Sequence, residues 1–338
     1  MTMQAAVYQQ YGTPEVMQLK TVDIPKPAAD EVLIKVMASS VSSGDWHVRA
    51  ADPWAVRLFN GLWRPKRQIL GSELAGVVAA TGSDVSEFKV GDAVFGATGL
   101  QLGANAEYIA LPESGPLAIK PSLLTFEQAA AIPFGAVTSW YFLNQVAELQ
   151  KGQRILIYGA SGALGVYAIQ LAKYLGAEVT ALCSGNNIEL VKSLGADEVI
   201  DYQQQEYLQS DFAKWDVIFD TVGKASFKQA KSVMTERGQF IAAAGGLKEM
   251  WQGIQQKLMN CFGLSQQSLK MGIAIETKEV IEKLKALVGE GRLEAVIGRD
   301  FYFGDIVEAH HYVESGRKVG TAVLRICKEG DGCNLDIP

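Results

Sequence analysis

Cysteine and histidine are scarce in this sequence, and their spacing excludes the usual metal and redox signatures. The four cysteines are Cys183, Cys261, Cys327 and Cys333. None of them forms a C-x-x-C pair, so neither a structural zinc lobe nor a redox dithiol is expected. We expect reduced, mostly buried thiols. The three histidines are His47, His310 and His311.

An excess of basic charge and long apolar runs are also lacking. The chain has 31 Lys and Arg against 37 Asp and Glu, a net charge of −6, which argues against a general nucleic-acid binder. No apolar run is long enough to span a membrane, and the first residues lack the pattern of a signal peptide. We therefore expect a cytoplasmic protein with no nucleic-acid or membrane partner.

Glycine is concentrated in one stretch, R-I-L-I-Y-G-A-S-G-A-L-G at 154–165. An apolar run at 155–158 leads into glycines at 159, 162 and 165 and then into a helical pattern at 166–172. This order predicts a strand, a tight turn and a helix whose N-terminus offers free N–H groups to a pyrophosphate. The spacing differs from the commoner G-x-G-x-x-G, so the turn alone does not establish nucleotide binding.

The surrounding pattern favours a dinucleotide domain. Further strands are expected at 177–183, 198–201, 215–220 and 239–244, with a helix at 188–194. Strands that alternate with helices predict a parallel sheet covered on both faces. An apolar stripe predicts a helix at 247–262, for which we expect packing on the adjacent domain or a role as a lid, and a sixth strand follows at 269–275. The alternative is an α/β domain whose glycine turn binds no nucleotide.

The N-terminal third shows a different pattern. Short strands divided by Gly and Asp turns predict a compact β-rich domain up to about residue 122, and Thr125 with Gln128 predicts a capping box. A helix at 277–288 returns the chain to this domain, which a strand at 295–303, a helix at 306–314 and a strand at 320–326 complete. The expected domains are therefore 1–122 with 276–338, and 123–275.

Five motifs in one order carry a family resemblance. They are V-S-S-G-D-W at 41–46, G-S-E-L-A-G-V-V at 71–78, K-V-G-D-A-V-F at 89–95, G-A-S-G-A-L-G at 159–165 and L-G-A-D-E-V-I-D-Y at 194–202. Over residues 3–326 the chain resembles the medium-chain dehydrogenase/reductase superfamily, and within it the zinc-free quinone oxidoreductase-like branch related to zeta-crystallin. The resemblance implies an α/β protein with a Rossmann doubly wound parallel sheet and a GroES-like β-rich catalytic domain. We also expect the cofactor to bind at the carboxyl ends of the strands, in the crevice between the domains. The resemblance implies that the strand at 269–275 lies at the sheet edge, and such an apolar edge predicts a homodimer formed through it.

The resemblance bears on zinc as well. The positions that match the metal ligands of zinc-dependent alcohol dehydrogenases are Ser42, Ser72 and Phe134, and these side chains are poor ligands or none. We therefore expect no metal. Without a Lewis acid the substrate must already be electrophilic, such as a quinone, an α,β-unsaturated carbonyl or a reactive aldehyde.

The candidate catalytic residues are Ser42, Asp45 and His47. The family loop V-N-P-x-D reads V-S-S-G-D here, so Asp45 is kept and Ser42 replaces the asparagine. Ser42 and Asp45 are equally well interpreted as turn residues that bond their own backbone. His47 is a candidate proton relay, whereas a solvated or packing role is expected for His310 and His311. No residue spacing indicates an indispensable general acid.

The cofactor is expected to be NADPH rather than NADH. The turn after the second strand reads C-S-G-N-N at 183–187 and lacks the acid that binds the ribose hydroxyls in NAD enzymes. The expected cofactor-binding residues are Thr138, Gly159, Ala160, Ser161, Gly162, Ala163, Leu164, Gly165, Ser184, Asn187, Tyr202, Thr221 and Gly245. The resemblance places Thr138 and Gly245 nearest the nicotinamide and Tyr202 at the phosphate, with Lys192 as a further candidate there.

The predicted function is zinc-independent, NADPH-dependent hydride transfer to a quinone or another activated carbonyl or alkene. Within enzymes, the alternatives are an enal or enone reductase and an aldehyde or alcohol dehydrogenase. From a different class, the alternative is an NADPH-binding regulator or adaptor without turnover.

The stretch at 49–67 combines five basic residues with one acid and three large aromatic side chains. It admits three interpretations: an amphipathic helix with a solvated basic edge, an aromatic wall of the substrate cleft, or a membrane-surface segment.

Overall fold

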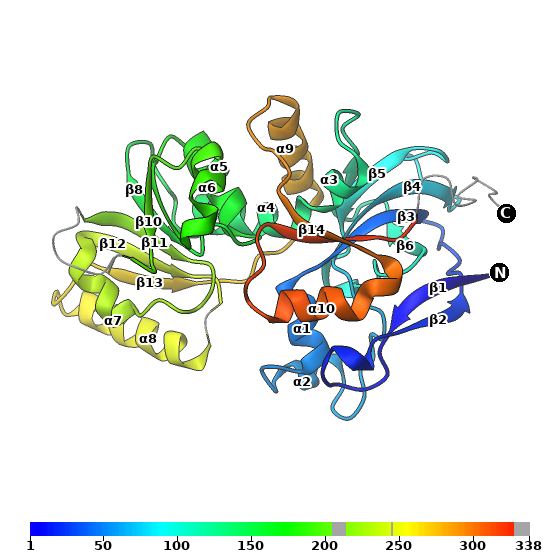
Figure 1. Ribbon diagram of the computed structural model, residues 1–338, viewed down its shortest axis with the longest axis horizontal. Helices are drawn as coiled ribbons and strands as arrows, with labels where there is room; N and C mark the ends of the chain where they lie inside the picture. Colours follow the sequence, from blue (N-terminus) through cyan, green and yellow to red (C-terminus); the bar gives the residue numbers. More distant parts are fainter. Residues whose placement is uncertain (205–213, 245, 328–338) are drawn as a thin grey trace. The chain divides into compact units, whose positions relative to one another are not determined.

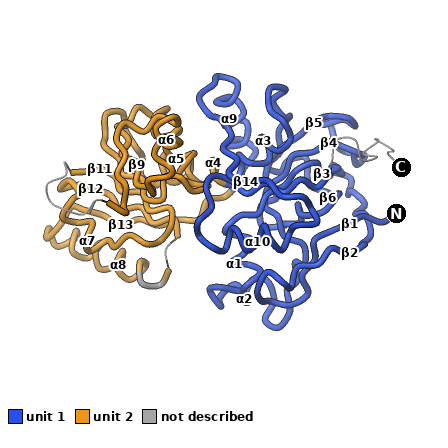
Figure 2. The backbone as a smooth tube through the Cα atoms, viewed as in Figure 1, with its two compact units in different colours: residues 1–134, 276–338 blue, residues 135–275 orange. Residues whose placement is uncertain are grey.

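The computed structural model describes residues 1–204, 214–244 and 246–327. The chain forms two compact units, unit 1 with residues 1–134 and 276–338 and unit 2 with residues 135–275 (Figure 2). Unit 1 extends past the expected boundary at 122 because helix α3 (Phe126–Ala130) packs on its strands β3 (Glu31–Val41) and β4 (Glu73–Thr81). Within the described ranges, no helix is long and apolar enough to cross a membrane.

Unit 2 is built on a six-stranded parallel sheet of order β10-β9-β8-β11-β12-β13. Its strands are β8 (Arg154–Tyr158), β9 (Glu178–Cys183), β10 (Glu198–Asp201), β11 (Trp215–Asp220), β12 (Met234–Ala242) and β13 (Ser268–Met271). Figure 1 shows α5 and α6 on one face of this sheet and α7 and α8 on the other. This is the doubly wound arrangement that the alternating pattern predicted.

The helices of unit 2 follow the strands in order. They are α4 (Pro133–Trp140), which begins at the end of unit 1 and continues as a π-helical turn (Tyr141–Val146), α5 (Gly165–Tyr174), α6 (Ile188–Ser193), α7 (Phe227–Ala230) and α8 (Leu247–Cys261). Short 3-10 turns lie at Gly185–Asn187 and Lys231–Val233.

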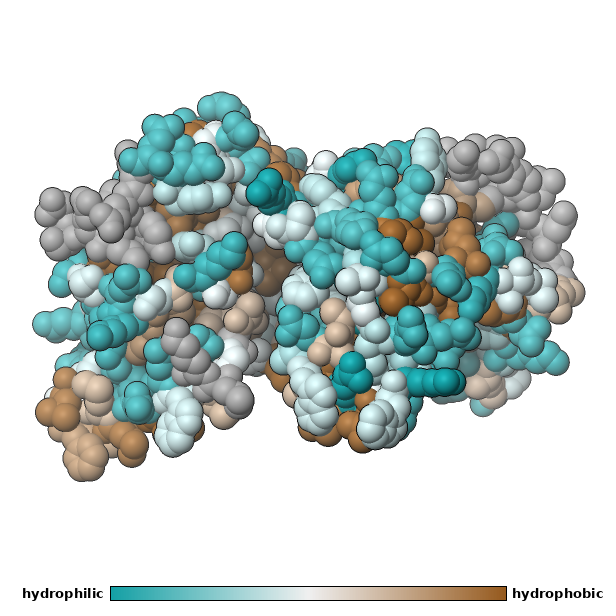
Figure 3. Space-filling view, turned by 60° about the horizontal axis from the view of Figure 1, so that its bottom comes forward, coloured by the Kyte–Doolittle hydropathy of each residue, from teal (hydrophilic) through white to brown (hydrophobic). Residues whose placement is uncertain are grey.

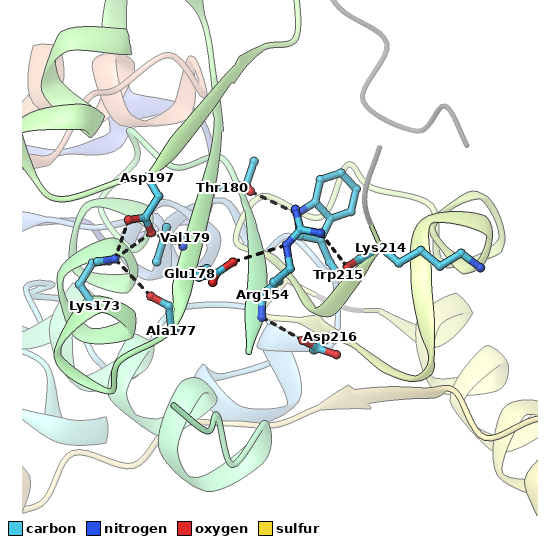
Figure 4. Close-up of polar contacts among 10 residues, drawn as sticks. All are labelled: Arg154, Lys173, Ala177, Glu178, Val179, Thr180, Asp197, Lys214, Trp215 and Asp216. Atoms are coloured by element: carbon cyan, nitrogen blue, oxygen red, sulfur yellow. Dashed lines mark hydrogen bonds and ion pairs between the residues drawn. The ribbon is translucent and has the colours of Figure 1, made fainter. Parts of the chain in front are cut away.

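Polar side chains fix the sheet of unit 2 at the amino ends of its strands (Figure 4). The carboxylate of Asp197 accepts hydrogen bonds from Lys173 Nζ at 2.7 Å and from the backbone N–H of Val179 at 2.7 Å. The buried Trp215 donates its indole N–H to Thr180 Oγ1 at 3.2 Å, which joins β11 to β9. These contacts lie at the amino ends of the strands and hold them in register. The loops that carry the predicted cofactor residues of this sheet leave the opposite, carboxyl ends.

Unit 1 is a β-rich domain, as predicted. Its larger sheet has the order β14-β15-β3-β4-β5-β7, with β6 paired to β3, and β1 and β2 form a separate antiparallel hairpin. Its remaining strands are β1 (Thr2–Val7), β2 (Gln18–Asp23), β5 (Ala93–Ala97), β6 (Tyr108–Pro112), β7 (Leu117–Ile119), β14 (Ile297–Tyr302) and β15 (Thr321–Arg325). Its other helices are α1 (Ser43–Ala50), α2 (Val56–Asn60), α9 (Lys278–Gly289) and α10 (Ile306–Glu314), with 3-10 turns at Pro14–Val16, Gly99–Gln101 and Phe303–Asp305.

Some local expectations hold and others do not. The capping box of α3 is present, with the Thr125 side chain accepting from Gln128 N. The sixth strand ends at Met271 rather than at 275, because Met271 already pairs with Ala242, the last residue of β12. The stretch at 49–67 is mostly loop around the short α2, so a continuous amphipathic helix, one of its three interpretations, is absent there.

The described cysteines depart from the expectation of reduced, mostly buried thiols at two positions, Cys261 and Cys327. Cys183 is a buried free thiol and Cys261 an exposed one. Cys327 is disulfide-bonded, so the expectation of reduced thiols is wrong for this residue. Cys333 lies outside the described residues.

Candidate active site

The glycine turn of unit 2 has the predicted geometry of a strand, a tight turn and a helix. Gly159 follows β8 with φ of +78°, and a Cβ placed on it would lie 2.2 Å from Val222 Cγ2. A Cβ on Gly165, the first residue of α5, would lie 2.3 Å from the carbonyl oxygen of Gly159. Only glycine fits these two positions, so the sequence enforces close packing of the helix on the turn.

The turn also offers hydrogen-bond donors. Within the described ranges, no atom accepts a hydrogen bond from the backbone N–H of Ser161, Ala163 or Leu164. Leu164 caps α5 without a side-chain hydrogen bond. Free N–H groups at the start of a ten-residue helix suit a bound pyrophosphate, so these residues fit a dinucleotide.

A polar cluster joins the glycine turn to the turn after β9. Asn187 Nδ2 donates to Ser161 Oγ at 3.0 Å and to Ser184 Oγ at 3.1 Å. The structure thus brings together three residues that the sequence nominated separately for the cofactor. Two hydroxyls and an amide supply both donors and acceptors, which is the chemistry that phosphate and ribose oxygens require.

An acid beside this cluster was missed from the sequence. A Cβ on Gly185 would lie 2.8 Å from Asp201 Oδ2, a buried oxygen with no hydrogen-bond partner among the described residues. The next residue, Tyr202, is 52% exposed and is held by its backbone N–H, which donates to Cys183 O at 3.2 Å. Asp201, the last residue of β10, therefore places a carboxylate beside the turn at 183–187, although the sequence of that turn contains no acidic residue.

The other expected cofactor residues lie on separate elements. Thr138 is half-buried on α4, and its buried neighbour Ser139 donates to Leu164 O at 2.9 Å, which ties α4 to the glycine turn. Thr221 Oγ1 donates to Tyr158 O at 2.7 Å and so joins the loop after β11 to the end of β8. Gly245 lies outside the described residues. Ser139 carried no sequence signal, because a serine inside an apolar helix is not distinctive.

In unit 1, Ser42 and Asp45 form the N-terminal capping box of α1. Asp45 Oδ2 accepts from the N–H and the hydroxyl of Ser42, both at 2.7 Å, and Oδ1 accepts from Gly71 N at 2.9 Å. Burial raises the pKa of Asp45 above its usual range. Both carboxylate oxygens of Asp45 accept hydrogen bonds. These contacts are the ones expected of Ser42 and Asp45 as turn residues that bond the local backbone.

His47 lies on α1, two residues after Asp45. Its Nδ1 is 2.6 Å from Asp52 O, and its ring stacks on Trp46 with 3.7 Å between centroids. One ring nitrogen is therefore committed to the loop that follows α1.

The positions that match zinc ligands do not fit a zinc ion. Ser72 Oγ is buried without a hydrogen-bond partner among the described residues, and Phe134 contributes its backbone N–H to Glu73 Oε2 at 2.7 Å. In the described chain, no group of three or more His, Cys, Asp or Glu side chains is placed to hold a metal ion. Hydroxyl and phenyl side chains do not replace the thiolate and imidazole that catalytic zinc requires.

Glu73 and Lys318 are two titratable residues of unit 1 that sequence reasoning missed. Glu73 is buried, and its carboxylate accepts hydrogen bonds from Ser40 Oγ and from the Phe134 N–H. Burial raises the pKa of Glu73 to about 7 and lowers the pKa of Lys318 to about 8, where the charges of Glu73 and Asp45 oppose the effect of burial. Shifted pKa values of this kind occur at reacting centres and in structural networks alike, so they do not by themselves assign Glu73 or Lys318 a catalytic role.

Residues 28–121 match the family model of the alcohol dehydrogenase GroES-like domain, and residues 194–324 match that of zinc-binding dehydrogenases. A protein named quinone oxidoreductase from Pseudomonas aeruginosa is 31% identical over 325 residues, which cover 93% of this chain and 97% of that protein. The chain belongs to the medium-chain dehydrogenase/reductase superfamily.

Two further similarities assign this medium-chain dehydrogenase/reductase to the quinone oxidoreductase-like branch. The solved structure of the quinone oxidoreductase from Coxiella burnetii superposes with a TM-score of 0.84 at 29% identity, covering 97% of this chain and 100% of that one. A protein named NADPH-dependent alkenal/one oxidoreductase, chloroplastic, from Arabidopsis thaliana is 30% identical over 334 residues, 95% of this chain and 79% of that protein. The resemblance carried by the five motifs is confirmed.

Proposed function

We propose that this medium-chain dehydrogenase/reductase is an NADPH-dependent oxidoreductase that reduces quinones or enones without zinc. One observation carries the proposal: Ser161, Ser184 and Asn187 meet in a polar cluster beside a glycine turn with free N–H groups. Relatives named quinone oxidoreductase and NADPH-dependent alkenal/one oxidoreductase support the class of reaction.

Different residues of the chain have different roles in this reaction. Bound NADPH supplies the hydride. The turn at 159–165 and the cluster around Asn187 hold and orient the dinucleotide, and orientation contributes a large share of the acceleration in such a reaction. A quinone that accepts hydride becomes the hydroquinone by taking one proton at oxygen, which water can supply. Serines at positions 42 and 72 agree with a substrate that needs no Lewis acid.

Steady-state kinetics test the proposal. Turnover of a water-soluble quinone and of an enone is measured with NADPH and with NADH, before and after treatment of the protein with a zinc chelator. We expect a higher kcat/KM with NADPH and no change after chelation. A preference for NADH contradicts the cofactor assignment, and loss of activity on chelation contradicts zinc independence. Saturable NADPH binding without turnover of any substrate supports the regulator instead.

We also propose a homodimer and a cytoplasmic location. β13 pairs with β12 on one side, and no described strand pairs with its other side. Such an edge invites pairing with a second copy. The free thiols of Cys183 and Cys261 are typical of a reducing compartment, whereas the disulfide of Cys327 is typical of an oxidising one. Fractionation of the native cells tests the location.

A further inference from the structure

One surface of unit 1 exposes apolar and cationic side chains together. It is formed by residues 53–67, here called the basic-aromatic segment, which includes α2. Its exposed apolar side chains are Trp54 (60%), Leu58 (71%), Phe59 (44%), Leu62 (45%) and Trp63 (84%). Figure 3 shows hydrophobic residues at the surface at its lower centre. A cluster of large exposed apolar side chains is typical of an interaction surface.

Buried contacts hold the basic-aromatic segment in a defined shape. Asn60 is fully buried; its Nδ2 donates to Tyr8 Oη at 2.8 Å, and its Oδ1 accepts from Arg67 N at 3.1 Å. Tyr11 Oη donates to Gly61 O at 2.7 Å. The tryptophans and leucines are thus displayed by an anchored loop, and their exposure is not the result of missing local packing.

The charge of the basic-aromatic segment is opposite to that of the whole chain. Its cations are Arg57, Arg64, Lys66 and Arg67. Among the described residues none of these cations forms an ion pair, although the protein has a net charge of −6. Arg57 lies over the Tyr11 ring at 4.6 Å and Arg67 over the Phe59 ring at 5.0 Å. Four cations without carboxylate partners form a local positive field that suits an anionic surface.

We propose that the basic-aromatic segment docks the protein on an anionic lipid bilayer. Arginine and lysine are attracted to anionic headgroups, while tryptophan and leucine enter the boundary between headgroups and acyl chains. Apolar side chains that alternate with cations along one short segment suit this shallow insertion better than a flat protein interface, whose centre is depleted of charge. The proposal replaces the expectation of no membrane partner, which was based on the lack of an apolar run long enough to span a membrane. Docking on the membrane surface does not require such a run.

Vesicle sedimentation tests the docking. The full-length protein is mixed with vesicles of phosphatidylcholine alone or with phosphatidylglycerol, at low and at high salt. We expect binding to the anionic vesicles only, weakened by salt. Arg64→Glu with Lys66→Glu, and separately Leu58→Ser with Trp63→Ser, should each lower the partition coefficient by about tenfold or more. The matched controls are Lys26→Glu with Lys89→Glu and Leu123→Ser, exposed residues of the same unit, which should bind like the parent protein.

Several outcomes overturn the docking. They are equal binding to neutral vesicles, no binding to anionic vesicles by the folded parent protein, and equal losses in the controls. Retention on polyglutamate without vesicle binding assigns the segment to an acidic protein partner. Loss of turnover on a water-soluble quinone in variants that still bind vesicles assigns it to the substrate wall. Because the vesicle assay needs no turnover, its failure leaves the proposed function untouched.

Discussion

Two adjacent histidines of α10 lie in opposite environments. His310 is fully buried, and neither ring nitrogen has a hydrogen-bond partner among the described residues. Burial, with the nearby charge of Arg49, lowers the pKa of His310 to about 3. His311 is exposed, with Nε2 2.8 Å from Glu15 Oε1. His310 therefore has a packing role, and its imidazole is neutral in the folded protein because a buried charge would have no partner in the described part of the chain.

We predict that His310→Leu makes the protein less sensitive to acid. Because the folded pKa lies below the unfolded value of about 6.5, the stability that neutral His310 contributes is present above that pH and is lost as the pH falls toward 3. Between about pH 7.5 and about pH 5 this loss is roughly 2 kcal/mol. Urea unfolding at both pH values should show it in the parent protein and not in the variant. His311→Leu is the control, and equal acid sensitivity of His310→Leu and the parent contradicts the assignment.

The coenzyme preference should depend on Asn187. Asn187→Asp places a carboxylate between Ser161 and Ser184, where it would repel a 2′-phosphate. We expect kcat/KM for NADPH to fall about tenfold or more, which corresponds to about 1.4 kcal/mol, and kcat/KM for NADH to fall much less. The same charge at the exposed Asn186 should have a smaller effect. An equal loss with both coenzymes would mean that Asn187 does not contact the phosphate.

At the scale of elements, the sequence predicted what depends on local pattern. β10, β11 and α10 have the predicted bounds, because apolar runs between turn residues define them without reference to neighbours. β13 ends early because its partner β12 ends, and a partner's length cannot be read from the strand itself. The same distinction applies to the site. Ser161 and Asn187 follow strands and could be nominated from the sequence, whereas the electrostatic interaction of Glu73 with Lys318 arises only from the fold of unit 1.

Helix α8 shows a further limit of sequence patterns. Its periodicity correctly indicated a helix with an apolar stripe, which was expected to pack on the adjacent domain. Within unit 2 the helix packs through its polar face, with Gly253 against Leu269 and Gln256 buried, while Trp251 and Leu258 of the apolar stripe are exposed. Packing of the stripe on the adjacent domain stays a prediction. Periodicity locates an apolar stripe on a helix, but it does not say which face of the helix is buried. A polar face can be buried when its side chains form hydrogen bonds there.

We predict that Gln256 holds α8 in place. Its Nε2 lies 2.8 Å from Ser265 Oγ and 3.0 Å from Gln267 O, the loop that leads into β13. Gln256→Ala removes the hydrogen bonds that this buried side chain makes to the loop, each of which contributes about 0.5–1.5 kcal/mol. Hydrogen exchange by mass spectrometry should show the amides of α8 exchanging about tenfold faster or more. Gln255→Ala, at an exposed neighbour, is the control, and similar exchange in the two variants would contradict the anchoring role.

At the scale of the whole molecule, large exposed apolar side chains lie near the edge of the unit 2 sheet. At this edge, no described strand pairs with the outer side of β13. α8 packs on β13 and leaves Phe262, the residue after it, 77% exposed. Beyond the end of β13, Ile273 is 83% and Ile275 74% exposed. An unpaired strand edge with apolar side chains at its end invites pairing with another copy of the chain. A twofold copy would supply the same edge and the same isoleucines.

The last prediction follows from that symmetry. In a twofold interface each substitution occurs twice, so Ile273→Asp would bring two carboxylates into one apolar contact and remove the burial of two isoleucines. We expect the parent protein to sediment as a dimer at about 10 micromolar and Ile273→Asp to sediment as a monomer, because each uncompensated buried charge costs several kcal/mol. Leu123→Asp places the same charge on a side chain of unit 1 that is 63% exposed and should remain dimeric. A monomeric parent, or a dimeric Ile273→Asp, would show that the edge of β13 is covered in another way.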